Sequence, residues 1–147
     1  MKEKSVGGIL FRQDGKHILY LLLLYERKND SKGEHSYWDF PKGHMEEGET
    51  ENQTLRREIL EETSIEDIVV IEGFLESIKY FFQRDGEPVA KEVVFFLCQT
   101  PQNEVRISYE HKDAKWLEYK EAMKALGFEN SRELLKKADR FVSGKKS

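Results

Sequence analysis

Apolar residues along this chain occur mainly in short runs bounded by turn residues, a pattern typical of β-strands. The unbroken run Ile18–Tyr25 predicts a strand that is buried on both faces. Ser5–Phe11 predicts a second strand, joined to the first by a turn at Asp14-Gly15. Asp85-Gly86 predicts a hairpin that leads into the strand Lys91–Gln99. Further strands are expected over Tyr37–Phe40, Ile68–Gly73, Phe74–Gln83, Glu104–Ile107 and Lys115–Leu117, and a long polar loop over Lys28–Ser36.

Helical periodicity is clearest over Thr50–Thr63, in the middle of the chain. Thr50 and Gln53 have the spacing of a capping box, which predicts that the helix begins there. The residues expected to form its inward apolar stripe are Leu55, Ile59 and Leu60. Two more helices are expected, one over Glu118–Leu126 that ends at Gly127 and one from near Asn130 with Glu133 as its capping partner.

These elements predict one domain of the α/β class. Strands lie on both sides of the mid-chain helix and two helices end the chain, so we expect a mixed β-sheet sandwiched between helices. A length of 147 residues fits one domain, which we assign to residues 1–142. Ser143–Ser147 is expected to be a short disordered tail.

The cysteine content and the apolar runs bear on location. Cys98 is the one cysteine and ends an apolar run, so we expect a buried thiol in a strand. Met1–Ser5 has no apolar segment of the kind that a signal peptide needs. The longest apolar run has eight residues, too few to span a bilayer. We therefore expect a cytoplasmic protein with no membrane partner.

Acidic residues are concentrated in one segment. The chain has 24 Lys and Arg residues against 28 Asp and Glu, a net charge of −4. Gly43–Glu66 holds eight acidic and two basic residues, or −6, which leaves +2 for the remainder. The balance disfavours bulk electrostatic binding to nucleic acid.

Three of these acidic residues fall on one helix face. Glu58, Glu61 and Glu62 are spaced i, i+3 and i+4, so their charges repel one another in the absence of a cation. A divalent cation would turn that repulsion into shared ligation, and carboxylates are preferred ligands of Mg²⁺ and Mn²⁺. The alternative is a solvated acidic face paired with Arg56 and Arg57.

The segment from Gly43 to Ile65 resembles the Nudix box, a motif of hydrolases that act on nucleoside diphosphates linked to another group. Seven of the eight positions that define the box agree, namely Gly43, Glu49, Arg57, Glu58, Ile59, Glu61 and Glu62. Ser64 departs, because the family usually has glycine there. A helix C-cap at Ser64 would have positive φ, at a cost of roughly 1 kcal/mol, or the helix end would shift slightly. No metal ligand is lost.

The resemblance implies an α/β/α sandwich that hydrolyses such substrates with Mg²⁺ or Mn²⁺. It implies Glu58 or Glu61 as the general base, a choice that the residues leave open. Arg57 is expected to orient a glutamate, with a plain surface ion pair as the alternative. The metal ligands that the resemblance implies are the carbonyl of Gly43 and the carboxylates of Glu58, Glu61 and Glu62.

Two motifs outside the box resemble asymmetric diadenosine tetraphosphate hydrolases. Trp38–His44 fits W-x-x-P-K-G-H, and Ser108–Trp116 fits S-x-E-H-x(4)-W. The residues to which the resemblance assigns roles are Lys42 and His44 at phosphate, Tyr80 under a nucleobase and Glu110 as a late metal ligand. Lys91 is an exposed type of charge and a candidate to line a polyphosphate groove. Each of the last three roles has a plainer alternative. Tyr80 could pack in the core, Lys91 could lie at a solvated strand edge, and Glu110 could be a loop carboxylate.

The leading hypothesis is hydrolysis of diadenosine tetraphosphate to ATP and AMP, with a small nucleotide as the partner. A second hypothesis keeps the machinery and changes the substrate to a nucleoside triphosphate, a diphosphoinositol phosphate or an RNA 5′ end. A third is a Nudix-fold module that binds a nucleotide without hydrolysing it. Such a module would be expected to lose glutamates of the box, and Glu58, Glu61 and Glu62 are all present.

Overall fold

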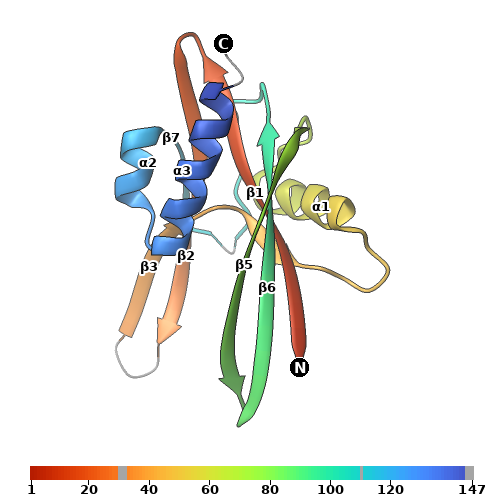
Figure 1. Cartoon of the computed structure of the whole chain (residues 1–147). Coiled ribbons are helices and arrows are strands. Elements are labelled where there is room, and N and C mark those ends of the chain that lie inside the picture. The colour runs from red at the N-terminus through yellow and green to blue at the C-terminus, as the bar shows by residue number, and fades with distance from the viewer. Residues whose placement is uncertain (30–32, 110, 145–147) are drawn as a thin grey trace.

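Strands make up most of the fold (Figure 1). The computed structural model describes residues 1–29, 33–109 and 111–144. The strands are β1 (Lys2–Asp14), β2 (His17–Asn29), β3 (Gly33–Asp39), β4 (Lys42–His44), β5 (Val69–Arg84), β6 (Glu87–Gln99) and β7 (Asp113–Glu118). The helices are α1 (Glu51–Thr63), α2 (Tyr119–Ala125) and α3 (Glu129–Gly144).

All of the described strands belong to one mixed sheet, as predicted. Its order is β3-β2-β1-β6-β5, with β4 paired to β1 and β7 paired to β2. β1 and β6 run parallel, and the other strand pairs are antiparallel. The two predicted tight hairpins are confirmed, and their turn residues Gly15, Asp85 and Gly86 have positive φ.

Helices cover both faces of this sheet, α1 on one side and α2 with α3 on the other (Figure 1). Alternation along the central strands explains this arrangement, because neighbouring residues of a strand point to opposite faces. Leu10 of β1 packs in the cluster that contains α1, whereas Ile9 packs in the cluster that contains α3. Leu21 and Leu22 of β2 divide in the same way. The expected α/β/α sandwich is confirmed.

Helix α1 begins and ends where the sequence predicts. Thr50 is the N-cap and completes a capping box with Gln53. Ser64 is the C-cap in the left-handed region (φ 63°), so the helix end has not shifted, and its hydroxyl donates to the carbonyl of Arg106 at 3.1 Å. The expected inward position of Leu60 is wrong, since its side chain is 45% exposed.

Two predictions of irregular or extended structure are also wrong. Lys28–Ser36 was expected to be a loop, but β2 and β3 pair as far as Asn29 and Gly33. Backbone pairing needs no apolar side chains, so a polar stretch can still be strand. Glu104–Ile107 is not a strand. Its backbone is tied instead to the end of α1, where the amide of Arg106 donates to the carbonyl of Thr63 at 2.9 Å.

Cys98 is buried in β6, and burial raises the pKa of its thiol to about 12. Helix α3 runs through Ser143 and Gly144, and residues 145–147 of the expected tail lie outside the described residues. No helix among the described residues is long and apolar enough to cross a bilayer.

Candidate active site

The site begins with a close approach between β4 and α1. β4 pairs with β1 in the register Val6–Gly43, which places Gly43 against the helix. A Cβ atom on Gly43 would lie 1.9 Å from the carboxylate carbon of Glu58. Glycine is therefore required here for contact, because any side chain would displace the carboxylate.

Two glutamates of α1 line a cavity of about 450 Å³. The side chains of Glu58 and Glu62 are only 15% and 7% exposed. Burial, opposed by the hydrogen bond from Arg57 and reinforced by the nearby Glu62, raises the pKa of Glu58 to about 7. The residues that line this cavity are Tyr25, Glu26, Lys42, Gly43, His44, Glu46, Glu58, Glu62 and His111.

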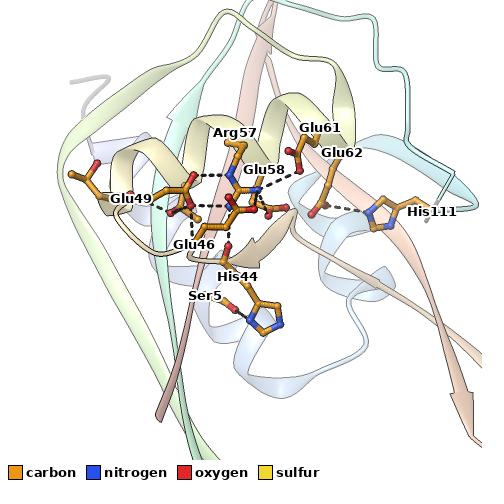
Figure 2. Close-up of polar contacts among 11 residues, drawn as sticks. Ser5, His44, Glu46, Glu49, Arg57, Glu58, Glu61, Glu62 and His111 are labelled. Carbon is orange, nitrogen blue, oxygen red and sulfur yellow. Dashed lines mark hydrogen bonds and ion pairs between the residues drawn. The ribbon is translucent and has the colours of Figure 1, made fainter. Parts of the chain in front are cut away.

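Arg57 is the centre of a polar network between the β4 loop and α1 (Figure 2). Its guanidinium donates to Glu58 Oε1 at 2.8 Å and to the carbonyl of His44 at 2.9 Å. It also binds both carboxylate oxygens of Glu49, at 2.6 and 2.9 Å. Its contact with Glu61 is longer, at 3.4 Å. Arg57 therefore bonds more closely to Glu58, a glutamate that lines the cavity, than to Glu61, the residue four positions on.

Glu49 anchors that network. Besides the two bonds from Arg57, its Oε1 accepts the backbone N–H of Glu46 at 2.8 Å and the hydroxyl of Thr54 at 2.9 Å. The pKa of Glu49 is lowered to about 2 by the hydrogen bonds from Arg57, from the amide of Glu46 and from the Thr54 hydroxyl. Burial has the opposite effect on this pKa, but a smaller one than these bonds together. The carboxylate thus stays charged and fixes the guanidinium.

Lys42 lies between the acidic cavity and a second one of about 360 Å³. Its ammonium is 3.0 Å from Asp39 Oδ2, while Asp39 Oδ1 accepts the hydroxyl of Ser131 in α3 at 2.9 Å. Burial by itself would lower the pKa of Lys42. The opposing effects, of which the attraction of the Asp39 carboxylate is the largest, together outweigh burial, so the pKa of Lys42 is raised. The second cavity is lined by Tyr37, Asp39, Lys42, Ile78, Tyr80, Val93, Phe95, Phe128, Asn130 and Ser131.

Tyr80 is 40% exposed and lines this second cavity, here called the aromatic cavity, together with Tyr37, Phe95 and Phe128. Phe81, the next residue of β5, lies on the opposite face of the strand, is 81% exposed and does not line this cavity. Lys91 lies across from Tyr80 in β6 and lines a third cavity with it. Burial, aided by Lys42 and Arg84 and opposed by Glu3, lowers the pKa of Lys91.

The predicted site residues do not all meet in one place. Gly43, Lys42, His44, Glu58 and Glu62 share the acidic cavity. Glu61 does not line that cavity, and its side chain is 60% exposed. Glu110 lies outside the described residues. Among the described residues, no three acidic, histidine or cysteine side chains form a ready metal cluster.

The donors that are present nevertheless fit a divalent cation. The half-buried carboxylate of Glu58 and the buried carboxylate of Glu62 lie close enough for Glu62 to raise the pKa of Glu58. Gly43 brings its backbone against the first of them. Oxygen donors of this kind suit a hard cation such as Mg²⁺ or Mn²⁺, which also takes ligands from water and from substrate phosphate.

Sequence reasoning missed three polar residues around this site. Tyr25 and His111 both contact Glu62, and Asp39 contacts Lys42. Tyr25 ends a long apolar run, so its pattern indicated only a core strand. The position of Asp39, three residues before Lys42, was the one available signal of an ion pair.

Known proteins resemble this chain in sequence and in structure. The model of the NUDIX domain matches residues 1–138. The chain is 32% identical to an asymmetrical bis(5′-nucleosyl)-tetraphosphatase of Rattus norvegicus over 97% of both chains, and 32% identical to one of Caenorhabditis elegans over 98% of this chain and 99% of that protein. A crystal structure of a binary complex of a C. elegans Ap4A hydrolase has a TM-score of 0.75 at 29% identity and covers 97% of this chain and 98% of that one. The chain belongs to the NUDIX domain family.

Proposed function

We propose that this protein hydrolyses dinucleoside polyphosphates with Mg²⁺ or Mn²⁺ and splits diadenosine tetraphosphate into ATP and AMP. The observation that carries the proposal is the contact of the Gly43 backbone with Glu58 in a cavity that also holds Glu62, Lys42 and His44. The relatives named as asymmetrical tetraphosphatases match over nearly the whole chain, which supports the choice of substrate.

The divalent cation would be held by Glu58, Glu62 and the backbone of Gly43, with Glu110 as a further ligand. When bound, such an ion neutralises phosphate charge and lowers the pKa of a water molecule. Lys42 and His44 would bind the polyphosphate. Arg57 would hold Glu58 in place through its bond to Oε1.

The aromatic cavity would receive a nucleoside. Lys42 lines both cavities. A nucleoside attached to phosphates that bind at Lys42 would therefore lie beside the aromatic residues Tyr37, Tyr80 and Phe128. Base stacking on an aromatic ring is worth about 1–3 kcal/mol. A substrate with a nucleoside at the end of a polyphosphate matches this sequence of surfaces.

A substrate panel tests the proposal. The purified protein with Mg²⁺, and separately with Mn²⁺, is given diadenosine tetraphosphate, ATP and a 5′-triphosphate RNA, and products are separated by anion-exchange chromatography. We expect ATP and AMP from the dinucleotide at the highest rate. Faster hydrolysis of ATP or RNA would reassign the substrate, and binding without any product would indicate a nucleotide-sensing module.

Matched glutamate variants test the machinery. Glu58→Gln and Glu62→Gln should each lower kcat by about 100-fold or more, because each removes a central charge. Glu133→Gln, on the exposed face of α3, should leave kcat unchanged. Glu61→Gln should have a small effect, since Glu61 does not line the cavity. A large loss of kcat in Glu61→Gln with unchanged Mn²⁺ affinity would instead make Glu61 the general base.

A further inference from the structure

Two polar side chains from other elements contact one carboxylate oxygen of Glu62. Its Oε2 lies 3.3 Å from the hydroxyl of Tyr25 in β2 and 3.2 Å from Nε2 of His111, just before β7 (Figure 2 shows the histidine contact). Glu62 is only 5% exposed, so its carboxylate has little access to water. A buried carboxylate needs such partners, because burial of an unpaired charge is costly.

The position of Tyr25 is fixed by contacts other than Glu62. Its ring stacks on Tyr37, with centroids 5.4 Å apart and planes 10° apart. Its single hydroxyl proton is shared between the carbonyl of Phe40, at 2.9 Å, and Glu62 Oε2, at 3.3 Å. The edge contact with His111 has a centroid distance of 4.5 Å and an angle of 86°. The hydroxyl therefore meets Glu62 from a preset position.

His111 is attached to the same helix end. Its backbone amide donates to the carbonyl of Ser108 at 3.2 Å, and the amide of Ser108 donates to the carbonyl of Glu62 at 3.3 Å. The ring is buried, and Nδ1 has no hydrogen-bond partner among the residues that the structure describes. Within that part of the chain, the contact with Glu62 is thus the only hydrogen bond of the ring.

We propose that Tyr25 and His111 are positioning residues that fix the carboxylate of Glu62 for a divalent cation. The proposal rests on the proposed function, in which Glu62 is a metal ligand. Residues that hydrogen-bond to a ligand orient it, and their loss commonly weakens metal binding by 10–100-fold. Both act through Glu62, and a purely structural role would affect stability without a selective effect on metal affinity.

The test measures Mn²⁺ binding directly, without substrate, by electron paramagnetic resonance of the free ion. Tyr25→Phe removes only the hydroxyl, and His111→Leu removes the ring nitrogens. We expect each to weaken Mn²⁺ binding by about 10-fold or more. Tyr20→Phe is the matched control, because it also removes a buried hydroxyl, one that donates to Asp139 at 2.6 Å on α3. It should lower the melting temperature and leave Mn²⁺ affinity unchanged.

A double variant separates positioning from packing. In a Glu62→Gln background, Tyr25→Phe should weaken Mn²⁺ binding no further, because the ligand that it positions is gone. His111→Gln, which keeps an N–H donor, should retain more Mn²⁺ affinity than His111→Leu. Wild-type affinity in both Tyr25→Phe and His111→Leu would overturn this inference.

The two proposals fail in distinguishable ways. If Glu62→Gln binds Mn²⁺ as tightly as the wild type, Glu62 is not a metal ligand and the proposed function loses its site. If Glu62→Gln weakens binding but Tyr25→Phe and His111→Leu do not, only the positioning role is wrong. An equal loss of affinity in Tyr20→Phe would also overturn the positioning role, because the effect would then be a general loss of stability.

Discussion

Arg57 and Glu49 form a two-point ion pair, with Nε 2.6 Å from Oε2 and Nη2 2.9 Å from Oε1. The same guanidinium donates to Glu58 and to the carbonyl of His44. Only the planar fork of arginine can make parallel bonds of this kind and still have donors free for other groups. One side chain therefore fixes both the loop that precedes α1 and a carboxylate of the acidic cavity.

Arg57→Lys should lower kcat/KM by about 100-fold, because a lysine keeps the charge but loses the two-point geometry that holds Glu58. Steady-state kinetics on diadenosine tetraphosphate measures this. Arg56→Lys is the control, since Arg56 bonds to Asn52 at 2.9 Å, and should have no effect on the rate. Equal losses in the two variants would mean that helix stability, and not geometry at Glu58, sets the rate.

The depressed pKa of Glu49 predicts how stability depends on pH. Its value of about 2 lies below the ordinary 4.5, so the charged form stabilises the folded state above pH 4.5. This contribution is lost as the pH falls from about 4.5 to about 2. Glu49→Gln should therefore have a lower free energy of unfolding than the wild type at pH 7, and the difference should shrink across that window. Urea unfolding at a series of pH values measures it, and a constant difference would contradict the assignment.

Gly43→Ala should lower activity strongly, because the added Cβ would lie 1.9 Å from the carboxylate carbon of Glu58 and displace that carboxylate. We expect a loss of about 100-fold or more in kcat, together with weaker Mn²⁺ binding. Gly15→Ala is the matched control, since Gly15 has positive φ but no atom within 4 Å of an added Cβ. It should cost about 1 kcal/mol of stability and leave kcat unchanged. A fully active Gly43→Ala protein would show that the contact has no role in the reaction.

Tyr80→Ala should raise KM for diadenosine tetraphosphate by about 10-fold, because stacking of one base is worth about 1–3 kcal/mol. Tyr80→Phe should retain most of the affinity, since the ring remains. Phe81→Ala removes a more exposed ring on the other face of β5 and serves as the control. If Phe81→Ala raised KM and Tyr80→Ala did not, the nucleobase would bind the opposite face of the strand.

The sequence predicted those parts of the fold that depend on local chemistry. The capping box at Thr50, the turn at Gly15 and the buried run in β2 all follow from residue type and spacing. Pairing in the sheet was less accessible, because it depends on partners far along the chain. β2 runs to Asn29 and β3 begins at Gly33 because the two strands pair with each other, and no local apolar pattern indicates this.

The same division holds in the site. Glu58, Glu62 and Arg57 could be predicted because they lie on one helix, where spacing fixes their relative positions. The contact of Glu62 with Tyr25 spans 37 positions, and that with His111 spans 49. Such contacts depend on how β2 and the segment before β7 pack against α1, and the spacing of residues in the sequence does not encode that packing.

β1 pairs with β2, β4 and β6, so the three residues of β4 are attached to the central strand of the domain. Amides in such a strand exchange with solvent only in the rarest and largest openings of a protein. Antiparallel pairing alternates, so Gly43, in the hydrogen-bonded pair with Val6, should share the slow hydrogen exchange of the sheet. The backbone of Gly43 beside Glu58 should therefore open only when the domain itself begins to unfold, so this close approach is preserved for as long as the protein is folded.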